Sequence, residues 1–132
     1  MHSSFAAAVD EPQALAGRRV VVMGLGLHGG GVGVAAFLRR HGANLVVTDL
    51  RNADVLAPSL KQLGAHGLRY VIGRHDLQDF REAEIVVRNP AVPLNAPALV
   101  EARANGARVE MELTLFLRWC TASNVVAVTG TR

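Results

Sequence analysis

The sequence predicts an α/β fold: a Rossmann-like, doubly wound and mostly parallel sheet with helices on both faces. Three observations predict it. Short runs that are apolar at consecutive positions recur along the chain, as in strands that are buried on both sides. Segments with helical spacing of apolar residues separate these runs, which gives a repeated β-α-β order with right-handed crossovers. The first run also leads directly into a glycine-rich turn and then a helix.

Five apolar runs are predicted as strands, and a sixth run is a weaker candidate. The five cover residues 20–23, 45–48, 68–72, 84–87 and 125–128, and the weaker candidate covers 108–110. Helices are expected at 33–41, 53–63, 96–105 and 113–119, with a short turn around 77–80. Gly42, Gly64 and Gly106 are expected to close three of these helices, because glycine readily adopts the left-handed conformation that often follows a helix.

Length and composition limit the class of protein. The 132 residues, half of them hydrophobic, suit one domain with a single core. The 14 basic and 11 acidic side chains give a net charge of +3, and the basic residues are scattered rather than clustered. A nucleic-acid partner is therefore not expected. The single cysteine, Cys120, cannot form an internal disulfide.

The start of the chain and its apolar runs bear on location. Residues 1–12 lack the charged and apolar regions of a signal peptide. No apolar run approaches the roughly 20 residues that a membrane-spanning helix needs. We therefore expect a cytoplasmic protein with no membrane partner.

The sequence Gly-Leu-Gly-Leu-His-Gly at residues 24–29 follows the first predicted strand and precedes the first predicted helix. This is the G-x-G-x-x-G pattern in its required context. Its glycines permit a tight turn and a close approach of phosphate to the backbone, where the helix N-terminus offers free N–H groups. The alternative interpretation is a merely flexible turn. We favour a nucleotide phosphate site.

Asp49 ends the second predicted strand, 20 residues beyond Gly29. A dinucleotide-binding fold places a ribose-binding carboxylate at this spacing, and such a carboxylate can equally accept from the imide N–H of uracil. The alternative is that Asp49 caps the following helix. Arg51 is a donor suited to carbonyl or phosphate oxygens. Gly73, after the third strand, belongs to the same rim of the sheet, where ligands of open α/β sheets bind.

The last residues combine a predicted strand with the sequence Thr129-Gly130-Thr131. Phosphate-binding loops begin in this way, but the Gly-Lys-Ser/Thr that completes such a loop does not follow. We therefore expect no ATP catalysis by these residues alone. The histidines show no metal-ligand spacing, so neither a metal site nor a catalytic residue is expected in this chain.

Together these features resemble the Mur ligase family of peptidoglycan synthesis, over residues 18 to 132, and within it the branch that adds D-glutamate. The resemblance is carried by ordered segments at residues 24–26, 47–51, 73, 85–93, 113–116 and 128–131. The chain departs from the family pattern in a glycine loop about two residues longer and in Asn89, Ala91 and Thr114, where Ser, Gly and Glu are common.

The resemblance implies a division of labour. Residues 1–123 would form the N-terminal domain that binds the uridine diphosphate part of UDP-N-acetylmuramoyl-L-alanine, and residues 124–132 would begin the ATP-binding central domain. The backbone of Gly26, Leu27 and His28 would meet the diphosphate and uridine. Uracil would be held by Asp49, Leu50 and Arg51, and Gly73 would contact the nucleotide through its backbone.

The parent ligase would use ATP and Mg²⁺ to activate the substrate carboxylate as an acyl phosphate, which the amino group of D-glutamate attacks. This chain would bind the nucleotide without catalysing the reaction and would need no cofactor. Other interpretations remain, among them an NAD-binding domain of an oxidoreductase, based on Gly24, Gly26, Gly29 and Asp49, and the sister ligase that adds L-alanine. A nucleotide-sensing module of another kind also suits the length.

Overall fold

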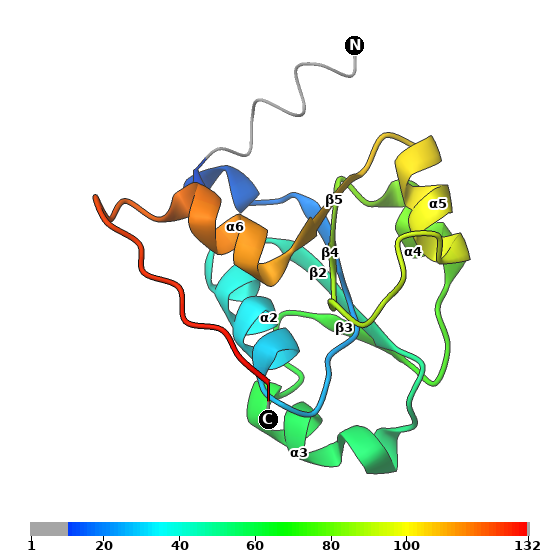
Figure 1. Cartoon of the computed structure of the whole chain (residues 1–132). Coiled ribbons are helices and arrows are strands. Elements are labelled where there is room, and N and C mark those ends of the chain that lie inside the picture. The colour runs from blue at the N-terminus through cyan, green and yellow to red at the C-terminus, as the bar shows by residue number, and fades with distance from the viewer. Residues whose placement is uncertain (1–10, 132) are drawn as a thin grey trace.

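The fold is built on one sheet of five parallel strands, seen in a computed structural model that describes residues 11–131 (Figure 1). The strands are β1 (Arg19–Met23), β2 (Asn44–Asp49), β3 (Arg69–Ile72), β4 (Ile85–Arg88) and β5 (Arg108–Met111). Their order in space is β3-β2-β1-β4-β5. The direction of strand addition reverses after β3, so the carboxyl ends of β1 and β4 flank a crevice of the kind that binds ligands in open α/β sheets.

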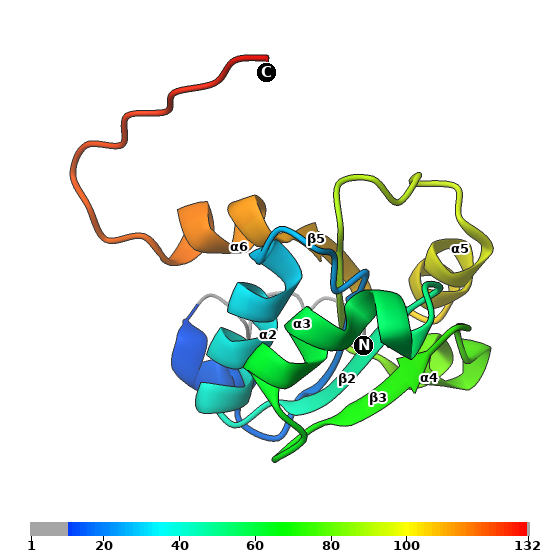
Figure 2. The ribbon, with the colours of Figure 1, turned by 90° about the horizontal axis from the view of Figure 1, so that it is seen from below.

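Helices cover both faces of this sheet, as predicted (Figure 2). One face carries η1 (Pro12–Leu15), α2 (Gly30–Arg40), α3 (Ala53–Leu63) and α6 (Glu112–Trp119), and the other carries α4 (Leu77–Glu82) and α5 (Pro97–Ala104). Alternate residues of β1 divide between two hydrophobic cores: Val20 and Val22 face the α2 side, and Val21 and Met23 face the α5 side. This alternation confirms that β1 is buried on both faces.

Most predicted elements are confirmed within a few residues. The helix at 53–63 has the predicted bounds, α2 begins three residues earlier than predicted, and the turn around 77–80 is the short helix α4. Gly42, Gly64 and Gly106 have positive φ angles of 79°, 71° and 86°. The weak candidate at 108–110 is the edge strand β5, which pairs with β4.

The strand predicted at residues 125–128 is not present. Residues 120–131 contain no helix or strand, and the side chains of Val126 and Val128 are 88% and 95% exposed. The segment overlaps α2 and α3 in Figure 1, but Figure 2 shows that it extends away from them. A strand forms by pairing, and the two edges of the sheet are β3 and β5. Residues 125–128 pair with neither edge, so this apolar segment forms no strand and stays exposed.

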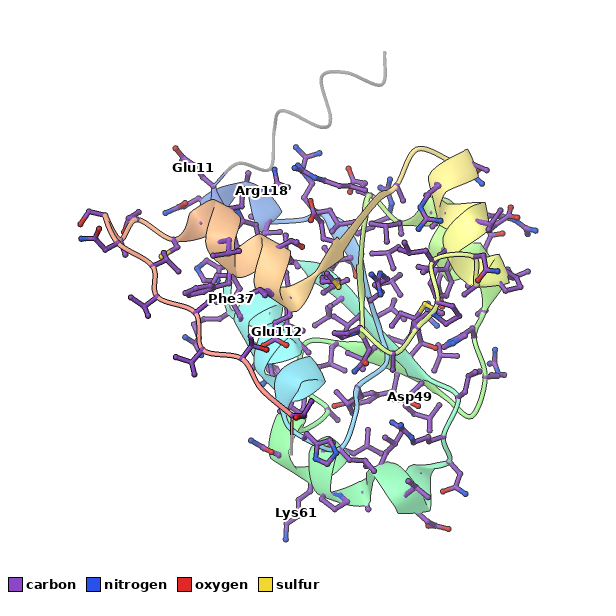
Figure 3. The ribbon with its side chains drawn as sticks, viewed as in Figure 1. Glu11, Phe37, Asp49, Lys61, Glu112 and Arg118 are labelled. Carbon is purple, nitrogen blue, oxygen red and sulfur yellow. The ribbon has the colours of Figure 1, made fainter. Side chains whose placement is uncertain are left out.

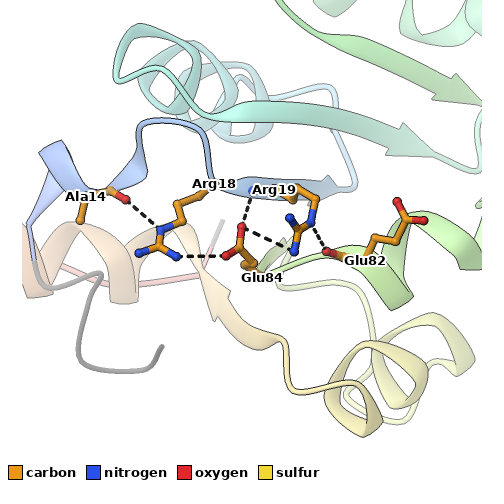
Figure 4. Close-up of polar contacts among 5 residues, drawn as sticks. All are labelled: Ala14, Arg18, Arg19, Glu82 and Glu84. Carbon is orange, nitrogen blue, oxygen red and sulfur yellow. Dashed lines mark hydrogen bonds and ion pairs between the residues drawn. The ribbon is translucent and has the colours of Figure 1, made fainter. Parts of the chain in front are cut away.

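An ion-pair cluster joins the amino ends of β1 and β4, at the opposite end of the strands from the crevice (Figure 4). The Glu84 carboxylate accepts from the Arg18 guanidinium at 3.0 Å and from the Arg19 backbone N–H at 2.8 Å. Burial opposes ionisation of Glu84, but the donors on Arg19 and Arg18 outweigh it and hold the pKa of this carboxyl below its ordinary value. Ionised Glu84 therefore fastens the start of β1 to β4.

Residues 1–10 and Arg132 lie outside the described residues, and with them most of the segment judged to lack an export signal. Within residues 11–131, no helix is both long and apolar enough to cross a membrane.

Candidate functional site

The glycine loop leaves β1 in a tight turn. Gly24 and Gly26 have φ angles of 92° and 72°, which a residue with a side chain rarely adopts. A Cβ on Gly24 would also lie 2.7 Å from the Cβ of Asn89, so the loop passes directly against the loop that follows β4. These two loops, at the carboxyl ends of β1 and β4, form the walls of the site.

Gly31 provides the close helix–strand packing expected of the third glycine in the motif. It lies in the first turn of α2 with an ordinary helical conformation, but a Cβ there would be 2.1 Å from the carbonyl oxygen of Leu25. Gly29, the third glycine of the predicted pattern, instead precedes α2 with a φ of 88°, and a Cβ on it would meet nothing within 4 Å. The close contact with Leu25 is therefore made by Gly31 and not by the third glycine of the G-x-G-x-x-G pattern.

Asp49 holds the glycine loop in place. Its Oδ2 accepts from the backbone N–H groups of Leu25 at 2.9 Å and Gly26 at 3.3 Å, and its Oδ1 accepts from the N–H of Arg51 at 2.9 Å. The residue is only 4% exposed. Its alternative role as a helix cap is wrong, because Asn52 caps α3 by accepting from Val55 N–H. Direct binding of uracil by Asp49 stays a prediction.

The backbone N–H groups of Leu27 and His28 have no hydrogen-bond partner among the described residues. They lie next to the start of α2, whose first N–H groups have no partner within the helix. The positive end of the α2 dipole adds a favourable potential for an anion. Since the N–H of Gly26 is bonded to Asp49, the available donors of this loop are those of Leu27, His28 and the α2 N-terminus.

A cleft of about 390 Å³ gathers these groups. Leu27 and His28 line it from the glycine loop, Arg51 from the loop after β2, and Asn89 from the loop after β4. The Arg88 guanidinium donates to the carbonyl oxygens of Asn89, Pro90 and Val92, at 3.0–3.4 Å, and so shapes the second wall. The cleft is therefore a concave surface with backbone donors on one side and a guanidinium at its rim.

The predicted site residues do not all share this cleft. Gly26, Leu27, His28 and Arg51 line it, whereas Asp49 lies beneath the loop. Leu50 is 65% exposed and does not line the cleft. Gly73 donates its N–H to the Asp49 carbonyl at 2.8 Å and likewise lies outside it. Thr129, Gly130 and Thr131 are in the exposed terminal segment.

Three residues of the site were missed as candidates. Ser59 on α3 donates its hydroxyl to the Gly26 carbonyl at 2.9 Å and so pins the loop from a second side. The Asn89 side chain lies against Gly24 and Gly26. Glu112, at the start of α6, also lines the cleft. Of the three, only Asn89 was noted in the sequence, where it departs from the Mur ligase pattern within residues 85–93.

His75 is a structural residue beside the site. Its Nδ1 lies 2.7 Å from the Thr48 hydroxyl, and its ring meets Phe80 edge-on. Burial lowers the pKa of His75, and the negative charge of Asp49 opposes that shift. Its contacts with Thr48 and Phe80 therefore hold His75 in place. No group of three or more His, Cys, Asp or Glu residues suited to a metal ion occurs in residues 11–131.

Comparison with known proteins places this geometry in a family. A family model described as the Mur ligase MurD-like N-terminal domain matches residues 18–110, which is most of the chain. This chain belongs to the MurD-like family of Mur ligase N-terminal domains. The expectation drawn from the glycine loop, the 47–51 segment and the loop after β4 is confirmed at the level of the family.

Relatives of this MurD-like domain carry the name UDP-N-acetylmuramoylalanine--D-glutamate ligase. The protein from Roseiflexus sp. (strain RS-1) is 56% identical over 118 residues, and that from Treponema pallidum is 47% identical over 120 residues. Each alignment covers 89% of this chain but only 25% and 22% of the relative. The chain thus spans about a quarter of the length of these relatives. Their name favours the D-glutamate branch over the L-alanine branch.

Solved structures support the fold alone. A pseudomurein peptide ligase type C from Methanothermus fervidus superposes with a TM-score of 0.56 at 22% identity, covering 78% of the MurD-like domain and 21% of that chain. Shikimate dehydrogenase from Aquifex aeolicus superposes equally well, with a TM-score of 0.55 at 16% identity, over 87% of the domain and 48% of that chain. Because a ligase and a dehydrogenase match alike, the backbone does not discriminate between their ligands.

Proposed function

We propose that this chain binds the uridine diphosphate part of UDP-N-acetylmuramoyl-L-alanine. The observation that carries the proposal is a cleft where three kinds of donor come together: the N–H groups of Leu27 and His28, which have no partner within residues 11–131, the start of α2, and the Arg51 guanidinium. A diphosphate matches these donors in charge and hydrogen bonding. Arg51 at the rim, with neighbouring Leu50, is placed to hold the uracil ring beyond the phosphates.

The proposed role is that of the N-terminal substrate-binding domain of a cytoplasmic, ATP-dependent ligase that joins D-glutamate to this nucleotide. The names of the relatives and the family match support it. In the complete ligase, ATP and Mg²⁺ would supply the activation of the carboxylate. In this chain Thr129, Gly130 and Thr131 are exposed, and their role as the start of an ATP phosphate loop stays a proposal. Residues 124–132 as the opening of a central domain stay a proposal.

The binding experiment is thermal denaturation of the 132-residue chain with UDP, NAD or ATP at equal concentrations. A ligand that binds only the folded state at tenfold excess over its Kd stabilises by about 1.4 kcal/mol, or roughly 3–6 °C for a domain of this size. We expect that rise with UDP, and none with NAD or ATP. Stabilisation by NAD without stabilisation by UDP would overturn the proposal.

Matched arginine variants locate the site. Arg51→Ala removes the guanidinium at the cleft, whereas Arg40→Ala removes another exposed guanidinium at the opposite end of α2. We expect the first variant to lose most of the UDP-induced rise in Tm and the second to keep it. Equal losses would show a general charge effect instead of a site. As a test of catalysis, we expect the chain to release no phosphate from ATP in the presence of D-glutamate and the nucleotide substrate.

A further inference from the structure

Glu112 places a negative charge at the position where the glycine loop would receive an anion. It is the first residue of α6, the helix that contacts α2 (Figure 3). A Cβ on Gly30 would lie 2.7 Å from the Glu112 Oε2, so this oxygen is close to the α2 N-terminus. Glu112 also lines the cleft together with Leu27 and His28.

The surroundings of Glu112 act on its carboxylate in opposite directions, because two helix N-termini favour the charge and burial opposes it. The first turn of α2 has no acidic residue of its own, so Glu112 is the side chain that faces its positive end. It also lies in the first turn of α6 and therefore at a second helix N-terminus. Burial raises the pKa of the Glu112 carboxyl above its ordinary value.

Cationic or titratable side chains reach the cleft of Glu112 from three sides. His28 comes from the glycine loop, Arg51 from the loop after β2 and Arg88 from the end of β4, while α2 contributes only Gly30, Gly31 and Val34 there. Glu112 is the one acidic residue that lines this cleft within the described part of the chain. Its charge thus opposes an anion at donors that otherwise attract one.

We propose that Glu112 is a specificity-determining residue, whose carboxylate competes with the ligand phosphates for the start of α2. This inference rests on the proposed binding of a uridine diphosphate. The repulsion grows with ligand charge. Free UDP has a terminal phosphate that ionises a second time near pH 6, whereas a sugar ester of UDP lacks that ionisation. Glu112 therefore disfavours free UDP more strongly than a UDP-sugar, and it selects the nucleotide whose diphosphate carries a sugar.

The test measures dissociation constants of the 132-residue chain for UDP and for UDP-N-acetylglucosamine by calorimetry at pH 7.5. Glu112→Gln removes the charge and keeps the shape. One like charge a few ångströms from the ligand in a partly solvated cleft changes affinity by about threefold to tenfold. We expect Glu112→Gln to bind UDP tighter by that factor and to gain clearly less for UDP-N-acetylglucosamine.

Two controls separate charge from structure. Glu82→Gln removes an equal charge on α4, outside the cleft, and is expected to leave both affinities unchanged. Glu112→Asp keeps the charge and is expected to bind UDP no tighter than the unmodified chain. As the pH falls through the raised pKa of Glu112, the advantage of the Gln variant should shrink toward onefold. His28→Gln, measured alongside, must leave that trend in place.

The outcomes are distinguishable. Equal UDP affinity of the unmodified chain and Glu112→Gln, or weaker binding by the variant, would overturn the competition while leaving the proposed function intact. An equal gain for both ligands would overturn the selection between them. If neither folded protein binds UDP, the proposed function itself fails and the inference fails with it.

Discussion

Gly31 and Gly33, two residues apart in α2, should respond in opposite directions to alanine. At Gly31 the added methyl group would lie 2.1 Å from the Leu25 carbonyl oxygen, 2.6 Å from its carbon and 2.7 Å from its Cα. All three are backbone atoms of the buried turn, so none can move as the end of a flexible side chain would. Overpacking typically costs about 1–3 kcal/mol and occasionally more. Because the three clashes coincide, we expect a loss of about 3 kcal/mol.

Gly33→Ala is the matched control. A Cβ on Gly33 would meet nothing within 4 Å, the residue is exposed, and its φ is that of an ordinary helix. Alanine in a helix interior is favoured over glycine by about 0.8–1 kcal/mol. For a domain of this size, the two variants should shift Tm by roughly −10 °C for Gly31→Ala and +3 to +5 °C for Gly33→Ala.

The measurement is thermal and urea denaturation followed by far-UV circular dichroism. If Gly31→Ala melts at the temperature of the unmodified protein, the close contact between α2 and the turn at Leu25 is refuted. If both variants lose stability alike, α2 is sensitive to any change and the specific contact is not the cause. A loss at Gly31 with a gain at Gly33 is the expected pattern.

Three further variants test other supports of the site and the fold. Asp49→Asn should lower stability by about 1–3 kcal/mol, measured by urea denaturation, and weaken UDP binding, because its amide cannot accept from all three N–H groups that the carboxylate serves. Asn52→Ala should cost about 1 kcal/mol in the same assay through loss of the α3 cap, without changing UDP affinity. Since the pKa of Glu84 is lowered in the folded state, its stabilisation is present above its ordinary value of 4.5 and disappears as the pH falls through the folded value. Glu84→Gln should therefore lose less stability between pH 5 and pH 3 than the unmodified chain, roughly the window that this linkage covers.

The fold was predictable because its signals are local and repeated. Apolar runs and helical spacing mark β1 to β4 and the helices directly in the sequence. Strand pairing is not local, which explains why one predicted strand is absent and why another was only a weak candidate. Residues 125–128 have the apolar character of a strand but no partner in the described chain. Residues 108–110 look polar, yet β5 forms beside β4, because the buried Glu110 is neutralised by Arg108 and Arg118, both at 2.7 Å.

The location of the site could be predicted from the sequence, but the packing contacts and hydrogen bonds that shape it could not. The motif spacing indicated the turn, the helix N-terminus and the rim of the sheet correctly. It could not show that Gly31 takes the packing position, because a longer loop changes which glycine meets the strand. Nor could it reveal that Ser59 and Glu112 approach the loop from α3 and α6, since both contacts join elements distant in sequence.

The hydrogen bonds that Asp49 accepts bear on the choice between a uridine diphosphate and NAD as the ligand. A dinucleotide-binding fold uses the carboxylate at this position to accept from ribose hydroxyls. Here that carboxylate is buried and accepts from Leu25, Gly26 and Arg51, so it is occupied in holding the loop. What the cleft offers a ligand is donors, namely the N–H groups of Leu27 and His28 and the Arg51 guanidinium. Donors suit phosphate and the uracil carbonyl groups, whereas ribose hydroxyls, like the uracil imide N–H, would have to compete with the loop for the Asp49 carboxylate. We therefore expect NAD to leave Tm unchanged at concentrations where UDP raises it. Equal stabilisation by the two ligands would show that Asp49 exchanges its hydrogen bonds to the glycine loop for hydrogen bonds to a ligand.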